Sequence, residues 1–139
     1  MKLSHLPLRL TTGAFILNSG VGKLQLDGET AAGLQQMGSS AFPQLADLDP
    51  EQFGKVLSAA EIALGAALLL PFVPSKLAGL GLTAFSASMV TMYLKTPGLT
   101  REDGIRPTQN GTAVAKDFWM LGIGLALILD SAKKKRKAN

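Results

Sequence analysis

The sequence predicts an all-α fold, a transmembrane four-helix bundle with an amphipathic segment on its outer surface between the first and second helices. Three observations support this. Hydrophobic residues make up 47% of the chain and charged residues only 17%, whereas soluble domains carry about 25% charged residues. Several long runs carry almost no charge. The length of 139 residues suits a single domain, residues 1–139.

The best-supported span is residues 77–94, which contain no charge and lie between Lys76 and Lys95. At about 1.5 Å per residue, such a helix nearly crosses a hydrocarbon core of about 30 Å. Residues 53–73 form the preceding span. Asp49 is expected to cap it, with Pro50 at its first position. Pro71 and Pro74 end it, and Ser75 is expected to cap the next helix, so that the two form a tight hairpin.

The first and last spans are less apolar. Residues 6–24 carry Arg9, Asn18 and Lys23, and a cleaved signal peptide is the alternative. That alternative is disfavoured because no small-residue cleavage site follows. Only 12 uncharged residues, 118–129, occur near the C-terminus, so the last span must extend over 113–132 to cross. A soluble helical bundle is also disfavoured, because residues 77–94 offer no polar face stronger than Ser and Thr.

The positive charges predict the orientation. With four spans both termini share one side, and that side holds Lys2, Arg9, Lys76 and the basic tail 133–139. The Lys and Arg bias therefore places the termini in the cytoplasm and the protein in the cytoplasmic (inner) cell membrane as a multi-pass protein. The tail is expected to anchor the last span. It can also contact lipid headgroups, through Lys133, Lys134, Lys135, Arg136 and Lys137.

Two segments are expected outside the membrane. Residues 25–48 place Leu34, Met37, Ala41 and Leu45 at roughly helical spacing, which predicts an amphipathic cap over the bundle. Residues 96–112 are rich in Pro, Gly and polar residues, which predicts an ordered loop rather than a helix.

Composition also excludes several kinds of chemistry. The chain has no Cys and a single His, His5. Thiolate nucleophiles, cysteine-ligated clusters and the usual zinc sites need residues that it lacks, so no metal site and no catalytic residue is assigned. Nucleic-acid binding is disfavoured because five of fourteen basic residues lie in the tail. Since no acid is near His5 in the sequence, it is expected at the surface.

Charged residues inside the spans form the candidate site, because charges at membrane depth usually face a partner or water in the bundle interior. From helix rise, Glu61 lies about 12 Å below the outer boundary, and the other members lie higher, at about 9 Å or less. The predicted cluster consists of Glu61, Lys116, Asp117, Asn18 and Lys23. Because an unpaired carboxylate would protonate at this depth, Glu61 is expected to pair with Lys116 or Lys23. Arg9 lies near the opposite, cytoplasmic face.

The role of this cluster stays open between three interpretations. Helix packing is favoured, a ligand or headgroup site comes second, and a proton or ion path third. A path would need polar residues below Glu61, where the sequence has only Ile, Ala, Leu and Gly. Small residues at every fourth position support packing, and they are Ala59, Ala63 and Ala67, then Thr83, Ala87 and Thr91, and Gly122 with Ala126.

Several short motifs resemble the DoxX-like family of small four-helix membrane proteins. Arg9 to Gly13 (RLTTG), followed by Ser19 to Leu24 (SGVGKL), resembles the family's R-x-x-x-G and SG-x-x-K-L opening. Ala60 to Gly65 (AEIALG) resembles its second helix, and Lys116 to Gly122 (KDFWMLG) its last. The long outer segment and the stretch GIRPTQNGTAVAKD are similar to the actinobacterial branch.

This resemblance implies a link to membrane redox chemistry. The name-giving members are linked to a thiosulfate:quinone oxidoreductase, and similar proteins are associated with sulfur oxidation and oxidative stress. A quinone cofactor and a membrane or peripheral redox protein partner are therefore implied, besides membrane lipid. The family's thiol-redox branch uses cysteines, which this chain lacks. A homo-oligomer stays open.

The leading hypothesis is a non-catalytic accessory or partner subunit of a redox or oxidative-stress system, whose polar cluster supports assembly or binds a small amphiphile or anion. One alternative is a quinone-linked oxidoreductase subunit, in which Glu61 or Asp117 handles protons and Lys116 holds an anion such as thiosulfate. The other is a small transporter.

Overall fold

The computed structural model describes the backbone of residues 2–137 and the side chains of residues 2–132. Apart from one isolated β-bridge between Thr100 and Pro107, the regular structure in this part is helical, which confirms the all-α prediction. The elements in chain order are α1 (His5–Gly22), η1 (Lys23–Gln25), α2 (Gly28–Ala41), η2 (Pro43–Asp47), α3 (Pro50–Leu69), α4 (Ser75–Lys95), α5 (Thr112–Ala115) and α6 (Asp117–Lys137).

Three helical segments of the described chain are long and apolar enough to cross a membrane. They are Pro50–Leu69, Ser75–Lys95 and Thr112–Ala132, and they match the predicted spans 53–73, 77–94 and 113–132. They indicate a membrane-embedded protein. The predicted first span is helical as α1 but is not among these three, and Arg9 and several polar residues lower its hydropathy.

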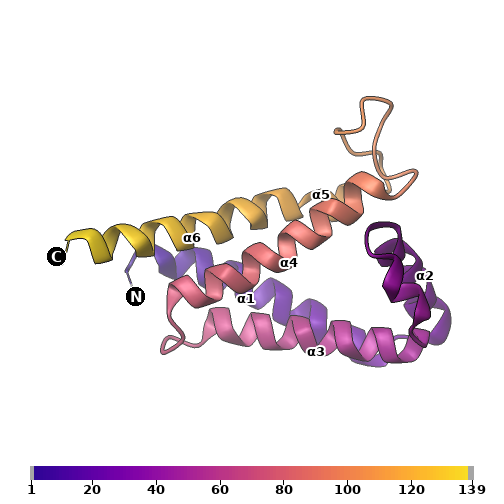
Figure 1. Ribbon diagram of the computed structural model, residues 1–139. Coiled ribbons are helices and arrows are strands. Elements are labelled where there is room, and N and C mark those ends of the chain that lie inside the picture. Colours follow the sequence, from indigo (N-terminus) through magenta and orange to yellow (C-terminus); the bar gives the residue numbers. More distant parts are fainter. Residues whose placement is uncertain (1, 138–139) are drawn as a thin grey trace.

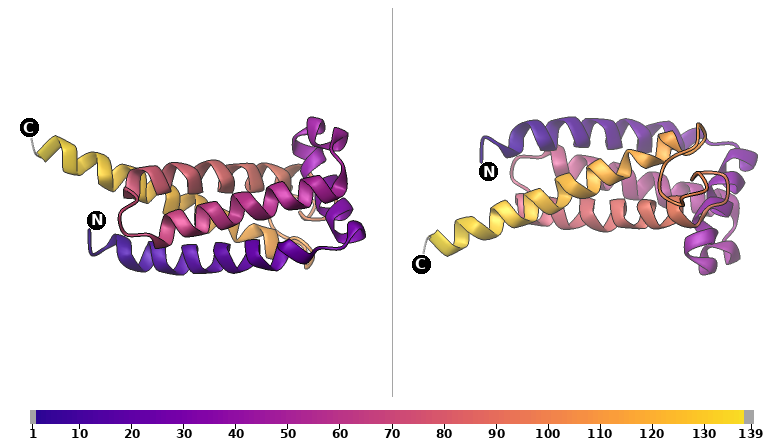
Figure 2. Two further views of the ribbon diagram at one scale, coloured as in Figure 1. Left: turned by 90° about the horizontal axis from the view of Figure 1, so that it is seen from below. Right: turned by 90° about the horizontal axis from the view of Figure 1, so that it is seen from above.

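The long helices pack as two pairs, α1 along α3 and α4 along α6. In Figure 1, α3 and α4 leave a common turn and diverge toward α2. The two termini lie together at the end of the molecule opposite α2 (Figure 2). The buried core lies where the pairs meet, and its members are Ile16, Leu68, Ala78, Leu82, Met120 and Leu127. The pairs are therefore joined at the end with the termini and apart at the end with α2.

Each pair contains a glycine at which the helix backbones come close. A Cβ on Gly65 of α3 would lie 2.6 Å from the backbone nitrogen of Leu17 in α1. A Cβ on Gly124 of α6 would lie 2.9 Å from the backbone nitrogen of Thr83 in α4. A side chain at either position would push the helices apart, and packing of this closeness is how helices associate in membranes.

Of the small residues singled out from the sequence, Thr83 lies where α4 meets α6, against Gly124, whereas Ala59, Ala63 and Gly122 do not lie where helices meet. Ala59 and Ala63 are exposed, and a Cβ on Gly122 would find open space. The expected packing face was therefore wrong at these positions. Spacing of four residues identifies a helix face, but it does not identify which face meets a neighbour.

Capping is as predicted for α3 but not for α4. The Asp49 carboxylate accepts a hydrogen bond from the Glu51 backbone N–H, and Pro50 occupies the first turn. At α4 the cap residue is Pro74, and no side-chain capping bond forms. The Ser75 hydroxyl instead contacts His5 and Arg9, so the prediction that Ser75 caps α4 is wrong.

The two connecting segments at the far end are both ordered. The Gln35 side-chain amide donates to the carbonyls of Leu45 and Leu48, which fastens α2 to η2. The long loop before Thr112 is held by the buried Tyr93, whose hydroxyl donates to the carbonyl of Ile105. Tyr93 thus anchors this loop to α4.

An ion pair at the tip of this loop adds to its order. The Arg106 guanidinium, together with the backbone N–H groups of Ile105 and Arg106, holds the pKa of the Asp103 carboxyl below its usual range. The predicted ordered loop at residues 96–112 is confirmed.

The close helix contact at Gly65 leads to a stability prediction. Gly65→Val should destabilise the protein by about 1–3 kcal/mol or more, because the added atoms overlap the α1 backbone. The measurement is thermal unfolding in mild detergent. Gly122→Val is the matched control, since its Cβ meets open space. Equal losses in the two variants would contradict the close packing of α1 and α3.

Candidate functional site

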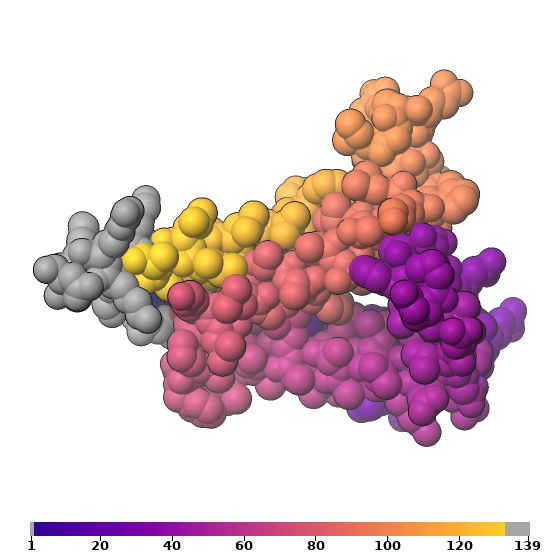
Figure 3. All heavy atoms as spheres, in the orientation of Figure 1, coloured from indigo at the N-terminus to yellow at the C-terminus, as the bar shows by residue number. Residues whose placement is uncertain are grey.

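A cavity of about 770 Å³ lies where the two helix pairs diverge. Its wall is mostly apolar and comes from α1, α3, α4, the start of α6 and the segment α2–η2. Aromatic and methionine side chains contribute prominently, among them Phe15, Phe53, Phe85, Met89 and Met92. Figure 3 shows a hollow between α2 and α4 on this side of the molecule. Its size and apolar lining are typical of pockets that bury small ligands.

The cavity follows from the way the helices are held. α3 and α4 separate from their common turn, so side chains that pack together near that turn no longer meet at the other end. The segment α2–η2 covers the gap, and Leu34, Met37, Phe42 and Leu45 line the cavity from this cover.

The first ion pair at the cavity joins α3 to the end of α1. The ammonium of Lys23 lies 3.0 Å from Oε2 of Glu61 and donates a second hydrogen bond, of 2.6 Å, to the hydroxyl of Ser19. Glu61 is buried, with 6% of its side chain exposed. The predicted pairing of Glu61 is present, and of the two proposed partners Lys23 is the one that meets it.

The second ion pair lies at the start of α6. The ammonium of Lys116 is 3.1 Å from Oδ2 of the fully buried Asp117 and 5.4 Å from the centre of the Phe15 ring. Such a cation above an aromatic face is an attractive contact. Lys23, Glu61 and Lys116 line the same cavity, so we treat the two ion pairs as one polar group. We call Lys23, Glu61, Lys116 and Asp117 the outer cluster.

The structure brings together four of the five predicted site residues. Lys23, Glu61 and Lys116 line the cavity, and Asp117 lies behind Lys116. Asn18 is exposed and does not line the cavity, so its predicted membership was wrong. Ser19 occupies that place, because one residue along a helix turns the side chain by about 100°.

Arg9 lies at the opposite end of the molecule, as predicted, and has a structural role there. Its guanidinium is 1% exposed and donates five hydrogen bonds, one of them to the hydroxyl of Ser75. The other four go to backbone carbonyls around the end of α3, those of Ala67, Leu68, Leu70 and Val73. The last carbonyls of a helix have no partner within the helix, and the five donors of Arg supply them.

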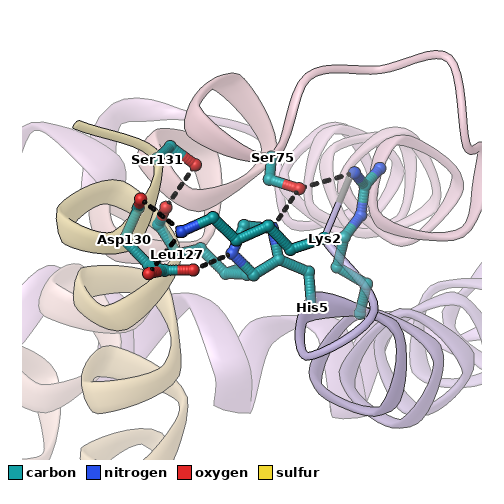
Figure 4. Close-up of polar contacts among 7 residues, drawn as sticks. Lys2, His5, Ser75, Leu127, Asp130 and Ser131 are labelled. Atoms are coloured by element: carbon teal, nitrogen blue, oxygen red, sulfur yellow. Dashed lines mark hydrogen bonds and ion pairs between the residues drawn. The ribbon is translucent and has the colours of Figure 1, made fainter. Parts of the chain in front are cut away.

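His5 lies beside Arg9 and is buried, so the prediction of a surface position was wrong. Its Nδ1 is 2.9 Å from the Ser75 hydroxyl, and its Nε2 is 2.7 Å from Oδ2 of Asp130. Lys2 completes the group, 2.7 Å from the other oxygen of Asp130 (Figure 4). We call Lys2, His5, Arg9, Ser75 and Asp130 the inner cluster.

The sequence contained a signal for the inner cluster. His5 and Arg9 are four residues apart, so they share a helix face. Asp130 directly follows the apolar run of the last span. Its pairing with His5 crosses 125 residues of chain, and sequence neighbourhood could not reveal it.

The order Ser75, His5, Asp130 matches the chain of groups that activates a nucleophile in hydrolases. Here, however, the Ser75 hydroxyl accepts a hydrogen bond from Arg9, is 7% exposed and does not line the cavity. The two ring nitrogens of His5 each have a hydrogen-bond partner, Ser75 for Nδ1 and Asp130 for Nε2. We therefore interpret the inner cluster as a structural link between α1, α4 and α6.

Two further findings concern metal binding and the basic tail. Within the described part of the chain, no group of three or more His, Asp or Glu side chains is arranged to hold a metal ion. The tail side chains expected to contact headgroups, Lys133 to Lys137, lie outside the described residues.

No protein-family model, curated protein or solved structure matches the chain. Fold and site together define a helical, membrane-embedded protein with an apolar cavity bordered by paired charges.

The inner cluster leads to a second prediction. Arg9→Lys should lower the thermal unfolding midpoint strongly, because one ammonium cannot reach five acceptors, and each unsatisfied buried carbonyl costs about 1–3 kcal/mol. Arg101→Lys, at an exposed position of the outer loop, is the matched control and should change little. A wild-type midpoint for Arg9→Lys would show that the guanidinium geometry is unimportant.

The Lys23–Glu61 pair leads to a third prediction, a double-mutant cycle. Glu61→Gln and Lys23→Met should each destabilise the protein, since each leaves a partly buried charge unpaired. The double variant should be less destabilised than the sum of the two, by about 0.5–3 kcal/mol. Unfolding in detergent measures all four proteins, and strict additivity would mean that the two groups are not coupled.

Proposed function

We propose that the chain is a non-catalytic accessory subunit of a membrane redox or oxidative-stress system, which holds a small amphiphile in its cavity. The observation that carries this proposal is the apolar cavity of about 770 Å³ with Lys23, Glu61 and Lys116 in its wall. An apolar chamber suits a hydrocarbon chain, and the outer cluster offers hydrogen bonds to a polar head or a small anion.

In this proposal α1 is the fourth transmembrane helix. Its 18 residues span about 27 Å, and it packs along α3. Arg9 in α1 is buried against carbonyls, and Lys23, directly after α1, is paired with Glu61, so neither charge is left unpaired toward lipid. Buried and paired charges of this kind are the ones that membrane helices tolerate.

The proposed orientation places the termini in the cytoplasm of a cell membrane, following the excess of Lys and Arg at that end. The segment α2–η2 is then the amphipathic cap on the outer surface. Leu34, Met37 and Leu45 turn toward the cavity, and Glu29 is exposed, which agrees with this role.

We infer membership of the DoxX-like family from the motifs alone. The residues that carry the resemblance occupy the two polar groups, Arg9 in the inner cluster, and Lys23, Glu61 and Lys116 in the outer cluster. Motif residues that lie together in space support the family inference better than motif residues scattered over the surface would. The inferred redox protein partner follows from this affiliation.

A quinone-linked oxidoreductase subunit is the second candidate. The observation that favours it is the combination of an apolar cavity with ammonium and carboxylate groups at one border. An ammonium could donate to a quinone oxygen, and Glu61 could exchange protons with it. A transporter is less supported, because the core at Leu68, Leu82 and Leu127 separates the outer cluster from the inner one.

The accessory role is tested by gentle detergent pull-down from native membranes. A tagged chain should recover a redox protein, and recovery of the chain alone would overturn the partner component. The double variant Lys23→Met with Glu61→Gln, which removes both charges, shows whether the outer cluster takes part in assembly. Gly122→Ala serves as a surface control.

The enzymatic alternative makes a separate prediction. Membrane vesicles that contain the protein should reduce a quinone analogue when thiosulfate is added, and Glu61→Gln should abolish this activity. The rate is followed by quinone absorbance. Unchanged activity in Glu61→Gln would exclude Glu61 as the proton carrier.

A further inference from the structure

Part of the exposed wall of the cavity lies on the side of the helices, besides exposed residues such as Gln44 and Asn110 at their end. Val56 and Ala60 on α3, and Ser88 on α4, line the cavity and are exposed. These positions lie within two of the helices that are apolar enough to span a membrane. Their exposed side therefore faces the hydrocarbon of the bilayer, if the protein is oriented as proposed above.

The water-facing end of the cavity is covered. Phe42 and Leu45 line it from the segment α2–η2, and Gln35 fastens this cover by two hydrogen bonds to its far end. Gly38 of α2 lies close against Leu45, which keeps the cover compact. The exposed side at Val56, Ala60 and Ser88 therefore gives an apolar chain a route into the cavity from the membrane.

The charge balance of the outer cluster selects the head of the ligand. Two ammonium groups, Lys23 and Lys116, are matched by two carboxylates, Glu61 and Asp117, each within 3.1 Å of its partner. Of these four groups Lys23, Glu61 and Lys116 line the cavity, with Asp117 behind Lys116, and an anionic or a cationic head would each disturb the balance of the cluster. Either would add an uncompensated charge, which is costly in such surroundings.

A neutral head with hydroxyl or carbonyl oxygens avoids this cost. An ammonium has three hydrogens, of which Lys23 uses two, for Glu61 and Ser19. The third can be donated to an oxygen of the ligand, and a hydroxyl of the ligand can donate to a carboxylate. The cluster therefore complements a neutral polar head without breaking its own ion pairs.

We propose that the cavity binds one neutral, single-chain lipid with a hydroxyl or carbonyl head, which enters sideways from the outer leaflet between α3 and α4. This inference rests on the proposed amphiphile-holding function and narrows it, because it excludes an anion and specifies the route. Quinones share this head chemistry with acyl alcohols and acylglycerols, so the experiment has to separate these sources.

The test uses the purified full chain in lipid nanodiscs and three probes with the same chain: oleyl alcohol, oleyl sulfate and oleyl trimethylammonium. A fourth probe, a decyl-substituted quinone, identifies the source of the chemistry. Binding is measured as a dose-dependent rise of the thermal unfolding midpoint, since a ligand of the folded state stabilises it. Oleyl alcohol, the quinone or both should raise the midpoint, and neither charged probe should.

Substitutions at the lateral opening provide matched controls. Ala60→Trp fills the cavity wall, whereas its neighbour Ala59 is exposed and does not line the cavity. Ala60→Trp should weaken apparent binding about tenfold or more, and Ala59→Trp should leave it unchanged. Ser88→Trp on α4, with Ala84→Trp as its control, repeats the comparison from the other side in case Ala60→Trp fails to fold.

The outcomes separate this inference from the function on which it rests. Equal or stronger binding of oleyl sulfate would overturn the neutral head, while the amphiphile-holding function would stand. Neutral-probe binding that survives both Ala60→Trp and Ser88→Trp would overturn the lateral route. If no probe binds wild type, both this inference and amphiphile holding fail, and only the pull-down bears on the accessory role.

Discussion

The hydrogen bonds of Arg9 are the interaction on which the rest of the structure depends. α3 ends at Leu69, and its last carbonyls would lie unpaired in an apolar environment without an external donor. Arg9 supplies them from α1 and also binds Ser75 at the start of α4. Through His5 and Asp130 the same group of contacts reaches α6. One end of the molecule is thereby tied together, and four helices share a single anchor.

At the opposite end the two pairs meet through the Lys116 ammonium above the Phe15 ring rather than through a group of hydrogen bonds such as that of Arg9. Glycine contacts keep α1 on α3 and α4 on α6, yet the pairs diverge, and the cavity is the space between them. The outer cluster borders this space instead of closing it. The inner and outer clusters, although similar in composition, therefore differ in role. The inner cluster is buried among helix ends and joins helices, whereas the outer cluster lies beside the cavity.

This difference also explains which residues are available for function. In the inner cluster the side chains form hydrogen bonds with one another or with the backbone, and Ser75 and His5 are both engaged in such bonds. In the outer cluster each ammonium has a carboxylate partner, but Oδ1 of the buried Asp117 has no hydrogen-bond partner among the described residues. Lys23 and Lys116 also border the cavity, with 21% and 31% of their side chains exposed. The polar groups that can contact a ligand therefore lie at the end where the two helix pairs are apart.

Local patterns in the sequence were sufficient for the long helices, for the Asp49 cap and for the pairing of Glu61 with Lys23, because helix rise converts residue number directly into height along the helix. Such patterns could not predict how each helix is rotated or which distant residues pair. The rotation of the helices placed Ser19 rather than Asn18 at the site and left Ala59 exposed, and the packing of α1 and α6 brought Asp130 to His5. Height depends on one helix alone, whereas facing direction and cavities depend on how several helices pack.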